Sequence, residues 1–156
     1  MPGKAVSTYL KDHLAGSTGG VSLARRLADG ADDPAERKEM SAIADEIEAD
    51  SEKLIEIMDR LDVPPSRFKQ AGAWIGQKLS AVKLNATAPD ARVLQYEAMI
   101  MGVTGKLQLW RSLAQVESGE QGLDSEEIAG FARDAEEQRR RLEKLHGNAA
   151  RFLAGD

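Results

Sequence analysis

The residues in this chain most able to do chemistry are two histidines and two carboxylates that interrupt apolar rows. His13 and His146, the only histidines, fall within the apolar spacing of the first and last predicted helices. Asp50 lies on the apolar side of the second predicted helix, and Glu97 on that of the third. Imidazole and carboxylate groups both bind divalent metals. These four residues are therefore the candidate metal ligands.

Hairpin geometry predicts which of the four residues meet. In an antiparallel helix pair, residues at equal distances from the loop centre face each other. With the loop centres that the sequence indicates, His13 falls opposite Asp50, and Glu97 falls opposite His146. In one interpretation each pair is a buried contact that satisfies both partners. In the other, the four residues form a ligand set for a divalent metal.

The direction of the third helix distinguishes these two interpretations. If the third helix runs parallel to the second, the two pairs lie near opposite ends of the bundle, ~20 Å or more apart at 1.5 Å per residue. If the four helices simply alternate in direction, both pairs lie near one end and could share a metal.

The composition predicts a single helical domain. The chain has 156 residues, enough to bury roughly 70% of its unfolded surface in one core. Aromatic residues are only 4% and charged residues 30%, a mixture typical of helical bundles. The absence of cysteine excludes disulfides and thiolate chemistry. With no signal-like start and no long apolar run, we expect a soluble, cytoplasmic protein.

Four long helices are predicted to position these residues. Apolar residues recur every three or four positions in each, as on one face of a helix, and the segments cover residues 7–29, 34–62, 90–116 and 125 onward, with apolar spacing that continues to 152. Asp33 and Asp124 are predicted N-caps. Pro34 suits the first helical position, and Glu36 is the reciprocal residue of a capping box.

The first predicted helix contains three interior glycines, Gly16, Gly19 and Gly20. Each costs up to ~1 kcal/mol relative to alanine. They indicate either a kink or a place where another helix or a ligand approaches closely.

Charge is unevenly distributed along the chain. Residues 32–62 contain twelve acids and four bases, a net charge of −8, whereas residues 63–89 contain no acid and four bases, Arg67, Lys69, Lys78 and Lys83. In the interpretation we favour, the basic segment lies across the acidic helix. In the alternative, these four residues form a surface that binds an anionic membrane or nucleic acid.

The arrangement of the segments resembles the ferritin-like superfamily. Two short hairpin loops and one long connection, residues 63–89, join the four helices. If mostly helical, that connection spans roughly 30 Å, about the length of the bundle. The ferritin-like superfamily has such a crossover between its second and third helices. The resemblance implies an all-α, ferritin-like four-helix bundle formed by residues 1–156, with a long, partly helical crossover.

The metal motif of that superfamily is incomplete here. The family places a Glu in each of the first and third helices and a Glu-x-x-His in each of the other two. The first helix has Ser17 at its middle, and the third has Glu97. The second has Asp50 without a nearby histidine, and residues 134–138 of the fourth also lack one. The resemblance therefore implies a bundle that has lost its metal, with no cofactor.

Two functions follow from these observations. The first is a non-enzymatic bundle that acts through protein–protein contacts, as a homodimer or with another protein. The alternative is a metal-dependent oxidase or metal-binding protein that holds iron or manganese through His13, Asp50, Glu97 and His146. We expect no nucleic-acid partner, because the arginine run 139–141 is surrounded by glutamates and the sequence contains no phosphate-binding loop. A membrane partner would use the basic segment.

Overall fold

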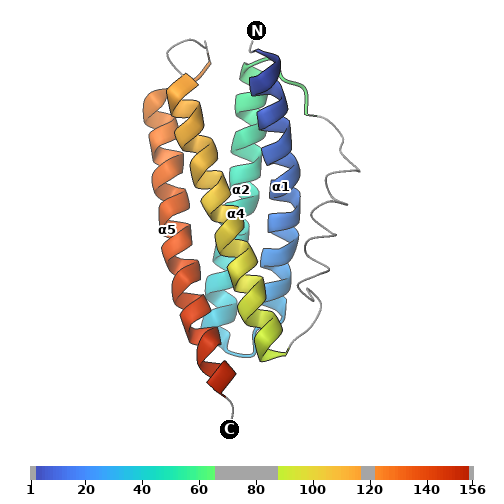
Figure 1. Cartoon of the computed structure of the whole chain (residues 1–156), viewed down its shortest axis with the longest axis vertical. Helices are drawn as coiled ribbons and strands as arrows, with labels where there is room; N and C mark the ends of the chain where they lie inside the picture. Colours follow the sequence, from blue (N-terminus) through green and yellow to red (C-terminus); the bar gives the residue numbers. More distant parts are fainter. Residues whose placement is uncertain (1–2, 66–87, 117–121, 155–156) are drawn as a thin grey trace.

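The computed structural model describes residues 3–65, 88–116 and 122–154. Over these residues every helix or strand assigned is a helix, which confirms the all-α class (Figure 1). The long helices are α1 (Lys4–Asp29), α2 (Pro34–Arg60), α4 (Pro89–Val116) and α5 (Ser125–Ala150), and a short 3-10 helix, η2 (Arg151–Ala154), follows α5.

Both predicted N-caps are confirmed. The Asp33 side chain accepts a hydrogen bond from the backbone N–H of Glu36 at 3.2 Å. The Asp124 side chain accepts from the backbone N–H groups of Glu126 and Glu127. These contacts satisfy backbone donors that have no partner within the helix. The Glu36 side chain does not close the predicted capping box, because its carboxylate faces α4 instead.

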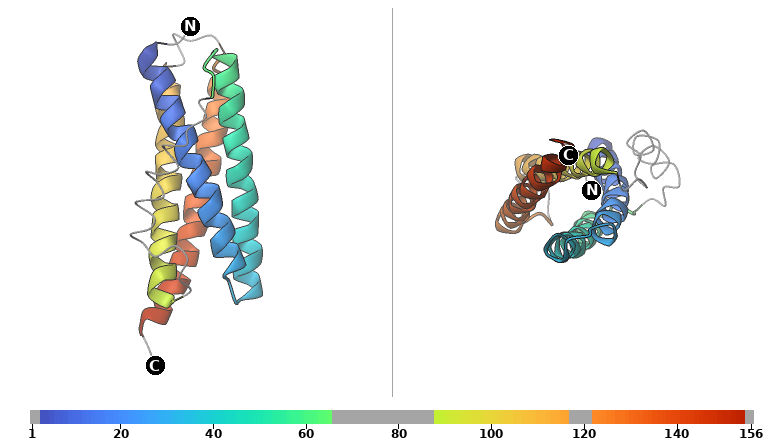
Figure 2. Two further views of the ribbon diagram at one scale, coloured as in Figure 1. Left: turned by 90° about the vertical axis from the view of Figure 1, so that its right-hand side faces the viewer. Right: turned by 90° about the horizontal axis from the view of Figure 1, so that it is seen from below.

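The helices form two antiparallel hairpins, α1–α2 and α4–α5 (Figures 1 and 2). α4 starts beside the turn that joins α1 to α2. There Arg92 donates to the backbone carbonyl of Leu27 at 3.4 Å and to the Glu36 carboxylate. α2 and α4 therefore run in the same direction. The predicted crossover falls largely on residues 66–87, which lie outside the described residues.

The apolar core has two parts, one toward each end of the bundle. The first, the turn-end core, lies near the α1–α2 turn and includes Leu27, Met40, Ile43, Tyr96 and Leu142. The second, the loop-end core, lies near the start of α5 and includes Leu10, Ile57, Leu107, Trp110 and Ile128. The predicted apolar row of the second helix is buried throughout, at Ile43, Ile47, Leu54, Ile57, Met58 and Leu61.

Two expectations about the helices were wrong. α1 begins at Lys4, three residues earlier than expected. Phe152 was predicted to extend the apolar row of the fourth helix, but it is 74% exposed. The reason is its position in η2, which lies beyond the ends of the neighbouring helices (Figure 1).

The glycines of α1 do not interrupt the helix, which is continuous from Lys4 to Asp29. At Gly20 an added Cβ would meet nothing within 4 Å, so the close approach expected there is not present. Gly122 differs, because its φ is +102° and an added Cβ would lie 3.2 Å from the Arg60 carbonyl oxygen.

We expect Gly20→Ala to raise the free energy of unfolding by up to ~1 kcal/mol, because it removes a helix-interior glycine without creating a clash. Gly122→Ala is the control and should destabilise, since its backbone conformation disfavours a side chain. Urea unfolding followed by circular dichroism measures both. Destabilisation by Gly20→Ala would contradict the open space beside this glycine.

Candidate functional site

Asp50 is a buried acid, only 6% exposed, and its carboxylate is held by side chains from two other helices. Nζ of Lys106, on α4, lies 2.6 Å from Oδ2 of Asp50. The Gln138 amide, on α5, donates to the same oxygen at 3.0 Å, and its own oxygen accepts from Lys106. Lys53, one turn along α2, lies 3.3 Å from Oδ1. We call Asp50, Lys106 and Gln138 the polar layer.

The polar layer lies between the two apolar cores. On α2, Ile47 belongs to the turn-end core and Leu54 to the loop-end core, with Asp50 between them. Lys106 and Gln138 divide the apolar residues of α4 and α5 in the same way. Serines from α1 and α2 meet near this level, where Ser51 donates to Ser17 at 2.6 Å.

The charges of the layer compensate each other. Burial raises the pKa of the Asp50 carboxyl, but the Lys106 ammonium, together with hydrogen bonds from Lys106 and Gln138, outweighs burial and lowers that pKa below its usual 3.8. Burial lowers the pKa of Lys106 by more than the Asp50 carboxylate raises it. Asp50 is therefore ionised at neutral pH and matched by a cation inside the bundle.

The predicted pairing of His13 with Asp50 was wrong. His13 lies edge-on against the Tyr9 ring, with ring centroids 4.7 Å apart. Burial lowers its pKa, against a smaller opposing effect of Asp12. Ser17, one helical turn further along α1, reaches the residue next to Asp50. In this hairpin Ser17, not His13, therefore lies beside the part of α2 that contains Asp50, so the observed register differs from the predicted one.

The predicted pairing of Glu97 with His146 is present, but it is not buried. Nε2 of His146 lies 3.2 Å from Oε1 of Glu97, and the two side chains are 30% and 47% exposed. The structure therefore does not bring the four predicted ligands together, since Asp50 is bound by Lys106 and His13 contacts Tyr9. Among the described residues, no three His, Asp or Glu side chains gather as a metal site would require.

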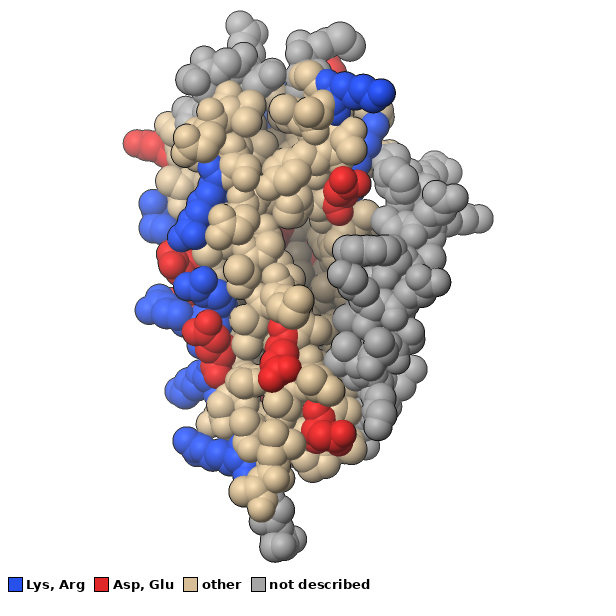
Figure 3. Space-filling view, viewed as in Figure 1, with Lys and Arg blue, Asp and Glu red and all other residues tan. Residues whose placement is uncertain are grey.

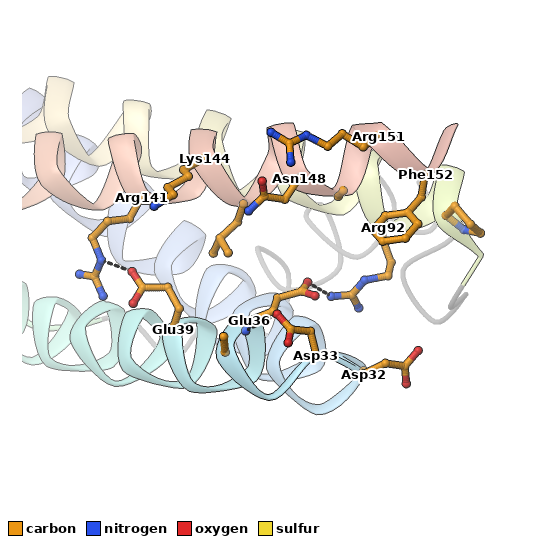
Figure 4. Close-up of a pocket in the computed structure, with 15 residues that line it drawn as sticks. Asp32, Asp33, Glu36, Glu39, Arg92, Arg141, Lys144, Asn148, Arg151 and Phe152 are labelled. Carbon is orange, nitrogen blue, oxygen red and sulfur yellow. Dashed lines mark hydrogen bonds and ion pairs between the residues drawn. The ribbon is translucent and has the colours of Figure 1, made fainter. Parts of the chain in front are cut away.

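A cleft of about 1070 Å³ opens at the turn end of the bundle, between the start of α2 and the end of α5 (Figure 4). We call it the end cleft. The α2 side carries the acids Asp33, Glu36 and Glu39, whereas Lys144 and Asn148 line the α5 side. The two sides therefore differ in charge.

Two arginines cross from the neighbouring helices to the acidic side of the end cleft. Arg141, on α5, donates to Glu39 at 2.5 Å and to both carboxylate oxygens of Glu46 at 2.8 Å. Arg92, on α4, binds Glu36, which also accepts from the Tyr96 hydroxyl at 2.5 Å. Burial, reinforced by the Glu36 carboxylate, raises the pKa of Tyr96. Since these carboxylates are already paired, the cleft is suited to binding rather than to proton transfer.

The four predicted surface-binding residues, Arg67, Lys69, Lys78 and Lys83, lie outside the described residues. Sequence reasoning missed Lys106. The signal that pointed to it was that Asp50 and Gln138 each interrupt an apolar row, because a buried carboxylate requires a cation and a buried amide requires hydrogen-bond partners.

No family model, no curated protein and no solved structure matches this chain. None of the helices that the structure describes is long and apolar enough to cross a membrane. The likeness to the ferritin-like superfamily stays a prediction drawn from the arrangement of the helices.

We expect Lys106→Met to lower the free energy of unfolding by about 3 kcal/mol at neutral pH, because it leaves the Asp50 carboxylate buried without its main partner. The control replaces the whole layer with apolar residues, as Asp50→Leu, Lys106→Met and Gln138→Leu together. This triple variant should stay within about 1 kcal/mol of the natural chain, since no charge remains to be paired. Urea unfolding tests both, and a single variant as stable as the triple one would contradict the pairing.

The single variant Lys106→Met should also reverse the way in which the free energy of unfolding depends on pH in the acid range. In the natural chain, the pKa of Asp50 is lower in the folded state than in the unfolded state, where it is about 3.8. At a pH below that value the unfolded state binds more protons, so stability falls as the pH drops through the folded-state pKa. In Lys106→Met, burial without the ammonium should raise that pKa. The contribution of Asp50 to the free energy of unfolding should then fall as the pH rises above about 4. The free energy of unfolding is measured from acid to neutral pH for the natural chain and for Lys106→Met, with Asp50→Asn as the baseline. The slopes of the two curves against pH test the prediction.

Proposed function

We propose that this protein is a non-enzymatic helical bundle, ferritin-like without a di-metal site, that acts by binding another protein chain. The observation that carries the proposal is the Lys106 ammonium in the polar layer. It lies where α2, α4 and α5 face one another, and it neutralises Asp50 at 2.6 Å. In the ferritin-like arrangement, carboxylates and histidines project toward this region to bind metals.

The chemistry of the layer supports a structural centre. A divalent cation needs several oxygen or nitrogen ligands converging within ~2–2.5 Å. Here one Asp50 oxygen already accepts from both Lys106 and Gln138, and the Gln138 oxygen accepts from Lys106. An ammonium among these groups also repels a second cation.

The apolar side chains on the surface support binding to another protein. Leu94 and Met101 of α4 are 43% and 74% exposed, and Phe152 and Leu153 of η2 are 74% and 52% exposed. Large apolar groups that gather on a surface often mark a site of protein–protein contact. Phe152 lines the end cleft, and the α4 pair lies on the outward side of the bundle.

The alternative is a metal-dependent oxidase or metal-binding protein that uses iron or manganese. Of its four predicted ligands, only Glu97 and His146 lie in contact with each other. That pair is preformed at 3.2 Å, which favours it over the other predicted ligands. It supplies two donors, fewer than structural or catalytic zinc sites use.

We expect the purified protein to carry no stoichiometric iron, manganese or zinc after expression in metal-supplemented medium. The paired layer offers no converging free ligands, and Glu97 with His146 supplies only two. Elemental analysis, with melting temperatures compared in added Mn²⁺, Zn²⁺ and chelator, measures both content and binding. About one metal per chain, lost on His146→Ala or Glu97→Ala, would overturn the proposal in favour of the metal-binding alternative.

A further inference from the structure

We propose that the outward face of α4 binds a second copy of this chain, with the two α4 helices antiparallel about a two-fold axis near Met101. The inference rests on the proposed function, since it names the partner of an interaction protein. It is argued from the residues that α4 presents to solvent, their spacing and their charges.

The outward row of α4 repeats at seven-residue intervals. Leu94, Met101 and Gln108 are all exposed, and Met101 is 74% exposed. Residues seven apart on a helix lie on nearly the same side, and the contacts between two packed helices repeat at this interval. In an antiparallel pair centred on Met101, that residue meets its own copy and Leu94 meets Gln108.

Two glycines beside this row leave room for a second helix. At Gly102 and Gly105 an added Cβ would meet nothing within 4 Å, so contacts within the chain do not require either glycine. Each costs up to ~1 kcal/mol in a helix relative to alanine. In the antiparallel arrangement Gly105 lies at the level of Glu97 of the other copy, which contacts His146 within its own chain.

The charges at the two ends of the row complement each other only in an antiparallel pair. Asp90 lies eleven residues before Met101 and Arg111 ten residues after it, and both are exposed. Within the chain, Arg111 comes no closer than 3.9 Å to Glu136. A two-fold axis at Met101 brings Asp90 of each copy to Arg111 of the other. A parallel pair would place like charges together.

The surface around the row fits such a contact. In Figure 3 the middle of the face over α4 is largely uncharged, and most of the Lys and Arg side chains lie along the edge over α5, with others at the upper right. With flanking parts of α1 and α5, the contact is a strip roughly 30 Å by 20 Å, on the order of 600 Å² per copy. Stable complexes bury ~800 Å² per partner. We therefore expect a reversible dimer.

Sedimentation velocity across a range of protein concentrations tests the association. The full chain should dimerise, and Met101→Glu should weaken dimerisation by about tenfold or more because it places two carboxylates at the axis. Ile55→Glu is the matched control, since Ile55 is an exposed apolar residue on α2, and it should leave dimerisation unchanged. Arg111→Asp should weaken the dimer, and adding Asp90→Arg should restore it.

Cross-linking tests the direction of the helices, because the chain has no cysteine of its own. Met101→Cys should form a disulfide-linked dimer on mild oxidation, and Ile55→Cys should not. Leu94→Cys should cross-link to Gln108→Cys in a mixture but not to itself. A Leu94→Cys homodimer would overturn the antiparallel arrangement.

Two outcomes would overturn the self-association itself. One is a monomer at every concentration with Met101→Cys unlinked, and the other is a dimer that Met101→Glu does not weaken. Either leaves the metal-free bundle intact, because that proposal is tested by metal content.

Discussion

The alignment of the two hairpins depends on one buried carboxylate and the cation that matches it. An ionised Asp50 inside the bundle is tolerable only with a partner, and Lys106 reaches it from α4. A second contact joins the same two helices, between Glu36 and Arg92. On α2 the two acids are fourteen residues apart, and on α4 the two bases are also fourteen apart. Equal spacing in the same order fixes both the register and the parallel direction of these helices.

The contact between α2 and α5 is also set by charged and polar pairs. Arg60 forms two hydrogen bonds with Glu127 at 2.9 Å, Gln138 donates to Asp50, and Arg141 binds Glu46. Exposed ion pairs contribute little stability individually, typically under ~1 kcal/mol.

Most of the folding free energy therefore comes from the two apolar cores, by burial of apolar surface. The polar pairs decide how the two hairpins align. Because the polar layer fills the centre of the bundle, the surfaces of the described residues that are open to a partner include the end cleft and the outer face of α4.

Much of the fold could be predicted because its signals are local. Asp33 and Asp124 cap helices through their own backbone neighbours, and apolar spacing of three and four residues identifies the buried face of each helix. The contact between Glu97 and His146 was predicted as well, since α4 and α5 keep the register that their loop implies. In each case the information lies within one hairpin.

The remaining features depend on how the hairpins pack together. The register of α1 against α2 places Ser17 rather than His13 beside this part of α2, and no apolar pattern within either helix contains that register. Lys106 was missed because lysine on a helix is usually solvated. It becomes identifiable only when Asp50 on α2 and Gln138 on α5 are placed at one level. Phe152 continues an apolar row, but the neighbouring helices end before it.

The side of α4 that faces the solvent is set by its apolar residues together with the polar layer. Met101 precedes Lys106 by five residues, which is about 140° around a helix, so the two side chains lie on nearly opposite sides. A rotation of α4 that exposed Lys106 would bury Met101, but it would expose buried apolar residues such as Val103, Leu107 and Trp110. It would also take the cation away from the Asp50 carboxylate. The apolar core and the ion pair thus keep an exposed methionine at the centre of the outward row, the arrangement that a contact with a second helix requires.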